Sequence, residues 1–230
     1  MDTDTHLRHL RRELDAFRAC LTGDLGAPVT TCGDWTLHDL AEHLGRSNAW
    51  AAVAVAERHG DHQEPAAPRE AAALRPWFDE RAARLVAALE GDPAAPAWTF
   101  AERPPHTVAF WRRRRALETL VHRWDAELAL GAPAPLDAEL AGDGVAEVFD
   151  TIAPRQIVRG RAAAPTYALR LYATDTGVSW TYGPGAPVAT LAAPAERLLL
   201  TLWGRLPAGG GAWEGDREAG LRMLRTALVP

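Results

Sequence analysis

The sequence contains no lysine. All 25 of its basic residues are arginine, against 30 acidic residues, and the formal net charge is −5 at pH 7. Proteins that bind nucleic acid through the phosphate backbone carry an excess of positive charge, so we expect no nucleic-acid partner. The missing lysine, with frequent alanine, glycine and proline, indicates a GC-rich bacterial genome. That is a statement about codon usage and not about function.

Long apolar runs and cysteine are also scarce. No run of 18 apolar residues occurs, so we expect no transmembrane helix. The first ten residues lack the charged-then-apolar pattern of a signal peptide. The two cysteines, Cys20 and Cys32, lie outside any metal or redox motif. We therefore expect a cytoplasmic protein with free thiols and no catalytic cysteine, while the pattern gives little support for a disulfide.

A run of four arginines, Arg112–Arg115, is the one local concentration of positive charge. Successive residues of a helix point in different directions, so the run does not form a single patch. We predict that most of it is a solvated helix face, with one arginine turned toward a site.

The first two thirds of the chain show helical periodicity. Apolar residues recur at spacings of three and four, and the expected helices span residues 5–23, 36–59, 71–90, 106–130 and 136–153. The sequence leaves open a continuation of the last helix beyond Pro154. The second helix has a full start signal: Thr36 and Asp39 form a capping box, and Trp35 and Leu40 occupy the hydrophobic-staple positions. Asp39 thus has a structural role that needs no chemistry.

The hydrophobic pattern changes from helical periodicity to alternation at about residue 165. Alternating apolar residues with glycine and proline boundaries predict short strands at 166–174, 177–183 and 187–193, in a small antiparallel sheet. Helices are expected at 194–206 and 216–228. The predicted fold class is α+β, with a helical domain over residues 1–160 and a small α/β domain over residues 161–230.

The predicted helix at 106–130 carries Glu118 and His122 one turn apart, beside its buried stripe. Such a pair offers two metal ligands from rigid backbone, but it equally suits a half-buried histidine held by a nearby carboxylate. His43 lies in the middle of the second predicted helix, where no cap requires it. Alone, it could be a surface or core histidine. The residues themselves leave both interpretations open.

Three segments, residues 34–50, 114–127 and 195–207, together resemble the mycothiol-dependent maleylpyruvate isomerase family, a branch of the DinB-like metal-binding bundles. The resemblance covers essentially the whole chain. It implies an N-terminal four-helix bundle that holds a divalent metal, usually zinc, followed by a small α/β domain. The metal ligands it implies are His43, Glu118 and His122. One departure is Leu117, where many relatives have a histidine before the glutamate.

Two imidazoles and one carboxylate suit zinc and leave coordination positions open, as in catalytic sites. Asp125 then becomes a candidate partner for a ligating histidine, although it could instead pair with Arg123. Arg205 is the candidate for binding a substrate carboxylate, and a structural role at a helix end would explain it equally well. Arg46 and Arg114 are further candidates from helical position.

The resemblance implies an enzyme that uses mycothiol as its thiol cofactor. A zinc-bound thiol loses its proton easily, and in the isomerase the thiolate adds to maleylpyruvate, which rotates and eliminates to the trans isomer. Transfer of the thiol to another electrophile is the companion hypothesis, so the expected partners are a small thiol and a small anionic substrate. The alternatives are a non-catalytic metal sensor and a zinc-dependent hydrolase. For the hydrolase the sequence offers no clear general base.

Overall fold

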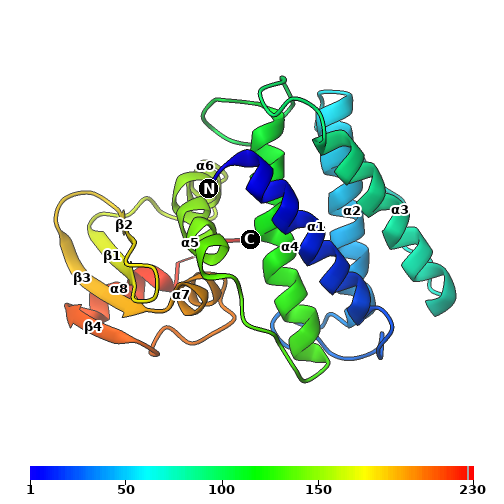
Figure 1. The fold of residues 1–230 in the computed structure, drawn as a ribbon. Helices are drawn as coiled ribbons and strands as arrows, with labels where there is room; N and C mark the ends of the chain where they lie inside the picture. Colours follow the sequence, from blue (N-terminus) through cyan, green and yellow to red (C-terminus); the bar gives the residue numbers. More distant parts are fainter. Residues whose placement is uncertain (227) are drawn as a thin grey trace. The chain divides into compact units, whose positions relative to one another are not determined.

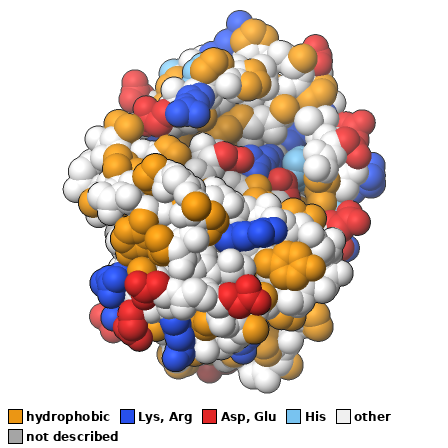
Figure 2. All heavy atoms as spheres, turned by 90° about the vertical axis from the view of Figure 1, so that its left-hand side faces the viewer, with side chains coloured by type: hydrophobic (Ala, Val, Ile, Leu, Met, Phe, Trp, Pro, Cys, Tyr) orange, Lys and Arg blue, Asp and Glu red, His pale blue; other side chains and the backbone are white. Residues whose placement is uncertain are grey.

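The computed structural model of the chain describes residues 1–226 and 228–230. The chain divides into two compact units, Met1–Ala134 and Pro135–Pro230, which are described separately below (Figure 1). None of the helices in the described ranges combines the length and the apolar composition that a membrane span requires. On the face shown in Figure 2, acidic and basic side chains are interspersed with hydrophobic ones.

The first unit, all of which is described, is a bundle of four helices at the positions predicted from periodicity. The bounds are α1 (Thr3–Cys20), α2 (Leu37–Ala56), α3 (Ala71–Leu89) and α4 (Val108–Ala129). Helix α1 packs mainly on α4, and α2 packs on both α3 and α4. Leucines of all four helices lie fully buried in the core. The packing of α2 against α4 is what positions the candidate site.

Helix α2 begins as the sequence predicts. Thr36 is the N-cap, and its hydroxyl accepts a hydrogen bond from the backbone N–H of Asp39. The Asp39 carboxylate accepts in return from the backbone N–H of Thr36 at 2.8 Å. Hydrogen bonds from Thr36 lower the pKa of Asp39. The capping box therefore fixes the start of the helix that carries His43.

The arginine run at the start of α4 is not the solvated face that the sequence predicts. Arg112, Arg114 and Arg115 are all buried. Arg112 donates to the backbone carbonyls of Leu89 and Gly91, at 2.8 Å each. Because guanidinium groups carry five donors, they can be buried wherever acceptors surround them. The prediction was wrong because those acceptors lie on other segments of the chain.

The second unit begins with a helical segment. It consists of α5 (Ala138–Glu147), a π-helical turn η1 (Val148–Ile152) and α6 (Ala153–Val158). The helix thus continues past Pro154, as the sequence allowed. Helix α5 packs on α7 (Ala195–Leu202), and Gly144 permits close approach because a Cβ there would lie 2.9 Å from Leu199. This packing groups α5 with the second unit, so the division follows residue 134, whereas the sequence placed it after residue 160.

The sheet of the second unit is mixed. Its described strands are β1 (Ala168–Ala173), β2 (Ser179–Tyr182), β3 (Pro187–Ala193) and β4 (Ala212–Gly215), in the order β2-β1-β3-β4. The outer pairs are antiparallel, but β1 and β3 are parallel, which corrects the predicted antiparallel sheet. The parallel pair arises because β3 lies beside β1 and not beside β2. Strand β4 was missed because it is only four residues long and follows a glycine-rich loop.

The last two helices, α7 and α8 (Arg217–Leu224), lie within the segments predicted to be helical. Helix α7 follows Pro194, its N-cap, and α8 follows Asp216, whose side chain accepts from the backbone N–H of Ala219. The predicted end of the final helix at residue 228 includes residue 227, which lies outside the described residues.

We expect the substitution Thr36→Ala to destabilise the protein by roughly 0.5–2 kcal/mol, the usual cost of losing an N-cap hydrogen bond. Thr107→Ala is the matched control, because Thr107 caps α4 without a side-chain hydrogen bond. Urea unfolding followed by far-ultraviolet circular dichroism measures both. Equal losses for the two variants would show that the capping box contributes nothing specific.

Candidate metal centre

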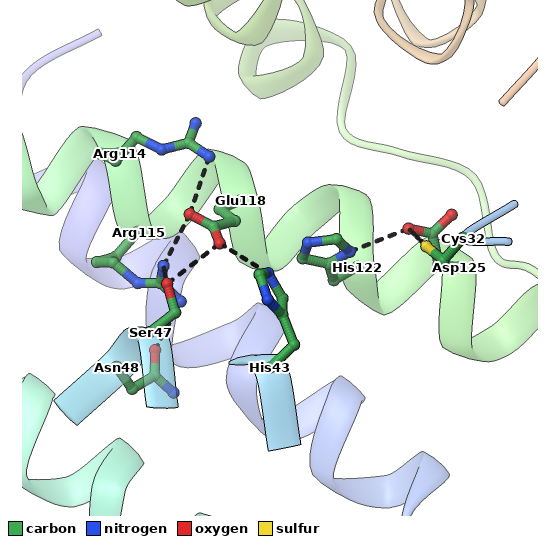
Figure 3. A network of polar contacts seen from close by, with 9 residues as sticks. All are labelled: Cys32, His43, Ser47, Asn48, Arg114, Arg115, Glu118, His122 and Asp125. Carbon is green, nitrogen blue, oxygen red and sulfur yellow. Dashed lines mark hydrogen bonds and ion pairs between the residues drawn. The ribbon is translucent and has the colours of Figure 1, made fainter. Parts of the chain in front are cut away.

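The structure brings together the three residues predicted to bind a metal. His43 comes from the middle of α2, and Glu118 and His122 come from successive turns of α4 (Figure 3). One potential ligand atom from each lies within 4.8 Å of the other two. Glu118 and His122 are buried, and His43 is partly exposed, at 38% of its side chain. The group is therefore anchored in the bundle and accessible on the His43 side.

The spacing of these donors fits a tetrahedral cation. His43 Nε2 lies 3.3 Å from Glu118 Oε1, and two ligands at zinc distances in tetrahedral geometry are separated by about 3.4 Å. The His43 and His122 rings meet edge to face, with centroids 5.1 Å apart. The donor set, two imidazoles and one carboxylate, is one that zinc accepts in catalytic sites. The residues present thus fit a divalent metal.

Glu118 is held by two buried arginines of its own helix. Arg114 Nη2 and Arg115 Nη1 each donate to Oε2 of Glu118 at 2.8 Å. Ser47 of α2 donates to Oε1 at 3.2 Å. Burial by itself raises the pKa of Glu118, but the charges of Arg115 and Arg114 and the contact with His43 overcome it. The pKa is held well below its usual value, so Glu118 is a carboxylate and a competent metal ligand.

Arg115 links the two helices. It is fully buried and donates to Ser47 Oγ at 2.7 Å and to Asn48 Oδ1 at 2.8 Å. Figure 3 shows this guanidinium between Glu118 and the two α2 side chains. Among the residues around Glu118 in this network, Arg114 was predicted from the sequence, but as a substrate ligand. Ser47 and Arg115 carried a usable signal, since each lies one turn from a predicted metal ligand.

His122 is oriented by Asp125. The Nδ1 atom of His122 lies 3.0 Å from Asp125 Oδ2, on the side of the ring away from Glu118 (Figure 3). Burial lowers the pKa of His122, and the Asp125 hydrogen bond only partly offsets this effect. A neutral ring that donates from Nδ1 to Asp125 keeps the lone pair on Nε2 for a metal. Asp125 also accepts from Thr31 Oγ1 at 2.6 Å.

The alternative partner proposed for Asp125 is engaged elsewhere. Arg123 binds Glu13 at 2.9 Å and Glu127 at 2.7 Å, and these contacts raise its pKa. Neither Cys20 nor Cys32 forms a disulfide in the described part of the chain, as expected. Burial raises the pKa of Cys20 to about 11, which makes it unreactive. Cys32 lies beside Asp125, with Sγ 3.7 Å from Oδ2, a proximity that the sequence did not indicate.

A pocket of about 500 Å³ opens beside His43. Its walls come from α2, from Trp35 just before that helix and from the loop that follows it. The lining residues are Trp35, Asp39, Glu42, His43, Arg46, Ser47, Trp50, His62, Gln63 and Glu64. Arg46, one of the predicted carboxylate ligands, is therefore in the pocket, where it also contacts Glu42 at 3.3 Å. The pocket has room for a small ligand next to the three potential metal ligands.

Arg205 belongs to the second unit, just after α7. Its Nη1 donates to the backbone carbonyl of Trp203 at 2.8 Å, and the guanidinium lies 5.6 Å from the Trp203 ring centroid. The side chain is half-buried. Its role toward a substrate carboxylate remains a prediction.

The family model described as the mycothiol maleylpyruvate isomerase N-terminal domain matches residues 7–127, more than half of the chain. The chain belongs to this family. The matched region spans the helical bundle and includes all three residues of the candidate metal centre. An uncharacterized protein of Mycobacterium tuberculosis, in strains CDC 1551 and H37Rv, is 30% identical over 160 residues, which are 66% of this chain and 81% of that protein.

Solved structures give the same fold. The crystal structure of the mycothiol-dependent maleylpyruvate isomerase superposes with a TM-score of 0.69 at 14% identity. A histidine-to-alanine mutant of that isomerase gives a TM-score of 0.68 at 16% identity. In both comparisons 93% of each chain is covered. The α+β architecture of this member of the family is therefore that of the isomerase.

Removal of Arg115 tests how the centre is held together. We expect Arg115→Met to destabilise the metal-free protein by roughly 3–5 kcal/mol, because it leaves a buried carboxylate short of compensating charge. The same change raises the pKa of Glu118. In the unchanged protein, the stabilisation from ionised Glu118 is present above pH 4.5, the ordinary carboxyl pKa, and is lost as the pH falls toward the lower folded value. The variant should show a smaller loss over this acid range.

Chemical denaturation at pH 7 and at a series of more acid pH values measures both effects. Arg11→Met is the matched control, since Arg11 forms an exposed pair with Glu90 and should cost at most about 1 kcal/mol. A loss for Arg115→Met no greater than that of the control would contradict the assigned role.

Proposed function

We propose that this protein is a metal-dependent enzyme that uses mycothiol, either to isomerise a maleylpyruvate-like substrate or to transfer the thiol to an electrophile. His43, Glu118 and His122 are the proposed ligands of a divalent metal, zinc in the first instance. The observation that carries the proposal is the convergence of their potential ligand atoms within 4.8 Å of one another, with His43 lining a pocket. Membership of the family supports the thiol.

A divalent metal at this position would lower the pKa of a bound thiol and so supply a thiolate at neutral pH. The residues of the chain prepare the site for that ion. Asp125 fixes the tautomer of His122, and Arg114 and Arg115 fix the Glu118 carboxylate. Preorganised ligands need little rearrangement when the ion binds.

The charge balance favours an anion as the further ligand. Two buried carboxylates, Glu118 and Asp125, are balanced by two buried guanidinium groups, Arg114 and Arg115. These four side chains therefore leave the charge of a bound divalent ion uncompensated, and an anionic thiolate or carboxylate would complement it. A structural zinc site is instead closed by four protein ligands. This balance supports catalysis over a purely structural role.

Two arginines are proposed to bind a substrate carboxylate. Arg46 already lines the pocket, and Arg205 of the second unit is retained from the sequence prediction. The cytoplasmic location is also part of the proposal, because low-molecular-weight thiols are kept reduced in that compartment.

We expect the purified protein to bind one divalent metal ion per chain. His43→Ala and His122→Ala should each weaken zinc binding by at least about tenfold, since each removes a direct ligand. His59→Ala is the control, because His59 is exposed and does not line the pocket. Elemental analysis and zinc titration calorimetry give the measurement. Absence of stoichiometric metal, together with unchanged zinc affinity in His43→Ala, would overturn the metal centre.

Mycothiol should stabilise the metal-loaded protein by about 2.7 kcal/mol at one hundred times its dissociation constant. We expect no such stabilisation in metal-stripped protein. Thermal denaturation with and without the thiol provides the test. If mycothiol did not stabilise the metal-loaded protein, the result would favour the metal-sensor or zinc-hydrolase hypothesis. Where thiol binds, assays with maleylpyruvate and with a model electrophile separate isomerase from transferase.

A further inference from the structure

The pocket beside the metal centre contains a second histidine paired with a carboxylate. His62 and Glu64 lie in the loop between α2 and α3, and both line the pocket that His43 also lines. His62 Nε2 lies 2.9 Å from Glu64 Oε2. A histidine oriented by a carboxylate is the arrangement that general bases use in many enzymes. No metal-binding group of the site includes either residue.

Glu64 is a charged and fixed partner. It is buried, and its other oxygen, Oε1, accepts from Arg81 Nη2 of α3 at 2.5 Å. Burial raises the pKa of Glu64, but the hydrogen bonds from His62 and Arg81 and the charge of Arg81 outweigh it, so that the pKa is below its ordinary value. The Glu64 carboxylate therefore accepts a hydrogen bond from Nε2–H of His62.

The support extends from this pair back to α2. The Arg81 guanidinium lies 4.4 Å from the centroid of the Trp77 ring and donates to the Trp77 carbonyl at 3.1 Å. The Trp77 ring packs on Gly45, where a Cβ would lie only 2.2 Å away. Gly45 is two residues from His43. The loop that carries His62 is thus fixed against the same stretch of α2 that carries the proposed metal ligand.

The second ring nitrogen of His62 is available. Within residues 1–226 and 228–230, the structure gives Nδ1 of His62 no hydrogen-bond partner, and the side chain is 24% exposed. With Nε2 protonated toward Glu64, Nδ1 is the acceptor. The neighbouring pair His59 and Glu57 has the same chemistry, at 3.0 Å, but it is much more exposed and does not line the pocket. Of these two pairs, the His62 pair is the one that combines orientation with access to the pocket.

We propose that His62 accepts the proton of the thiol that binds in this pocket and that Glu64 is its positioning residue. This inference rests on the proposed thiol-dependent function. In the step, the S–H bond breaks, its electron pair remains on sulfur, and the proton moves to Nδ1 of His62. The resulting imidazolium is balanced by the Glu64 carboxylate. The same proton is available to return to sulfur when the thiol leaves.

Other charged groups set the environment of His62. Those lining the pocket from α2 are Asp39, Glu42, His43 and Arg46. From the loop comes Glu64, and behind it Arg81 of α3. Three of these groups, Asp39, Glu42 and Glu64, are carboxylates, and two, Arg46 and Arg81, are guanidinium groups.

Proton counting on binding tests the proposal without turnover. Mycothiol is titrated into the zinc-loaded full-length protein by calorimetry, in two buffers of different ionisation enthalpy. The pH is set at about 7.5, between the ordinary pKa of histidine, about 6.5, and that of a thiol, about 8.5. In the unchanged protein the proposed imidazolium lies between the thiolate and the Glu64 carboxylate, which favour its charged form, so we expect fewer protons to reach the buffer than in His62→Gln. In His62→Gln we expect about one proton released per thiol bound.

His59→Gln is the matched control and should behave as the unchanged protein. Zinc content and far-ultraviolet circular dichroism establish that each variant is folded and loaded, and His62→Asn serves as a second replacement. Equal proton release from His62→Gln and the unchanged protein, with thiol bound in both, would overturn the role of His62 and leave the proposed function standing. If the zinc-loaded unchanged protein did not bind mycothiol, both the role of His62 and the proposed thiol-dependent function would be overturned.

A pH–rate profile gives a second readout where turnover is measured with maleylpyruvate or a model electrophile. We expect His62→Gln to lower kcat/KM at neutral pH by about 100-fold or more, with the deficit shrinking as the thiol ionises at higher pH. Glu64→Gln should lower kcat/KM less than His62→Gln does, and it should shift the pH dependence of kcat/KM. A profile of unchanged shape in both variants would contradict the assignment.

Discussion

The buried carboxylate of Glu118 imposes the constraint on which the first unit depends. A carboxylate without water must be matched by charge and hydrogen bonds, and Arg114 and Arg115 supply both from one turn away. Arg115 in turn has more donors than Glu118 can use, and Ser47 and Asn48 of α2 accept from it. Satisfying the arginine therefore fixes how α2 lies against α4. This packing of α2 on α4 places His43 beside Glu118. The buried polar network and the candidate metal centre therefore share Glu118 and depend on the same helix packing.

The network also explains why the centre is divided into a rigid and an open side. His122 and Asp125 are buried on α4, where burial keeps the imidazole neutral. His43 is partly exposed and borders the pocket. An incoming ligand would thus meet the centre from the α2 side while the α4 side holds it in place. A site with one fixed and one accessible face suits exchange of a small ligand more than permanent structural closure.

The sequence predicted what depends on local pattern. Helices α1 to α4 and the Thr36 cap follow from periodicity and start signals, and the convergence of His43, Glu118 and His122 followed from the family resemblance. The burial of Arg112, Arg114 and Arg115 was mispredicted, because whether an arginine is solvated depends on which acceptors the fold places around it, and for Arg112 and Arg115 these include groups far away in the chain. The parallel pairing of β1 with β3 failed for a related reason, since alternation shows that a strand exists but not which strand lies beside it. His62 and Glu64 carried no signal because they lie in an aperiodic loop.

The bundle helices and the loop between α2 and α3 have different consequences for function. The proposed metal ligands come from helices whose register is fixed by a buried polar network, and such networks tolerate little change. Part of the pocket wall comes from the loop between α2 and α3, and loops accommodate substitution more readily than the elements they join. Relatives can therefore share the bundle and its ligands while differing in what the pocket accepts. A TM-score of 0.69 at 14% identity shows that the fold is kept where most of the sequence differs. The loop supplies His62, Gln63 and Glu64 to the pocket, so substitutions there can change what the pocket binds without changing the bundle.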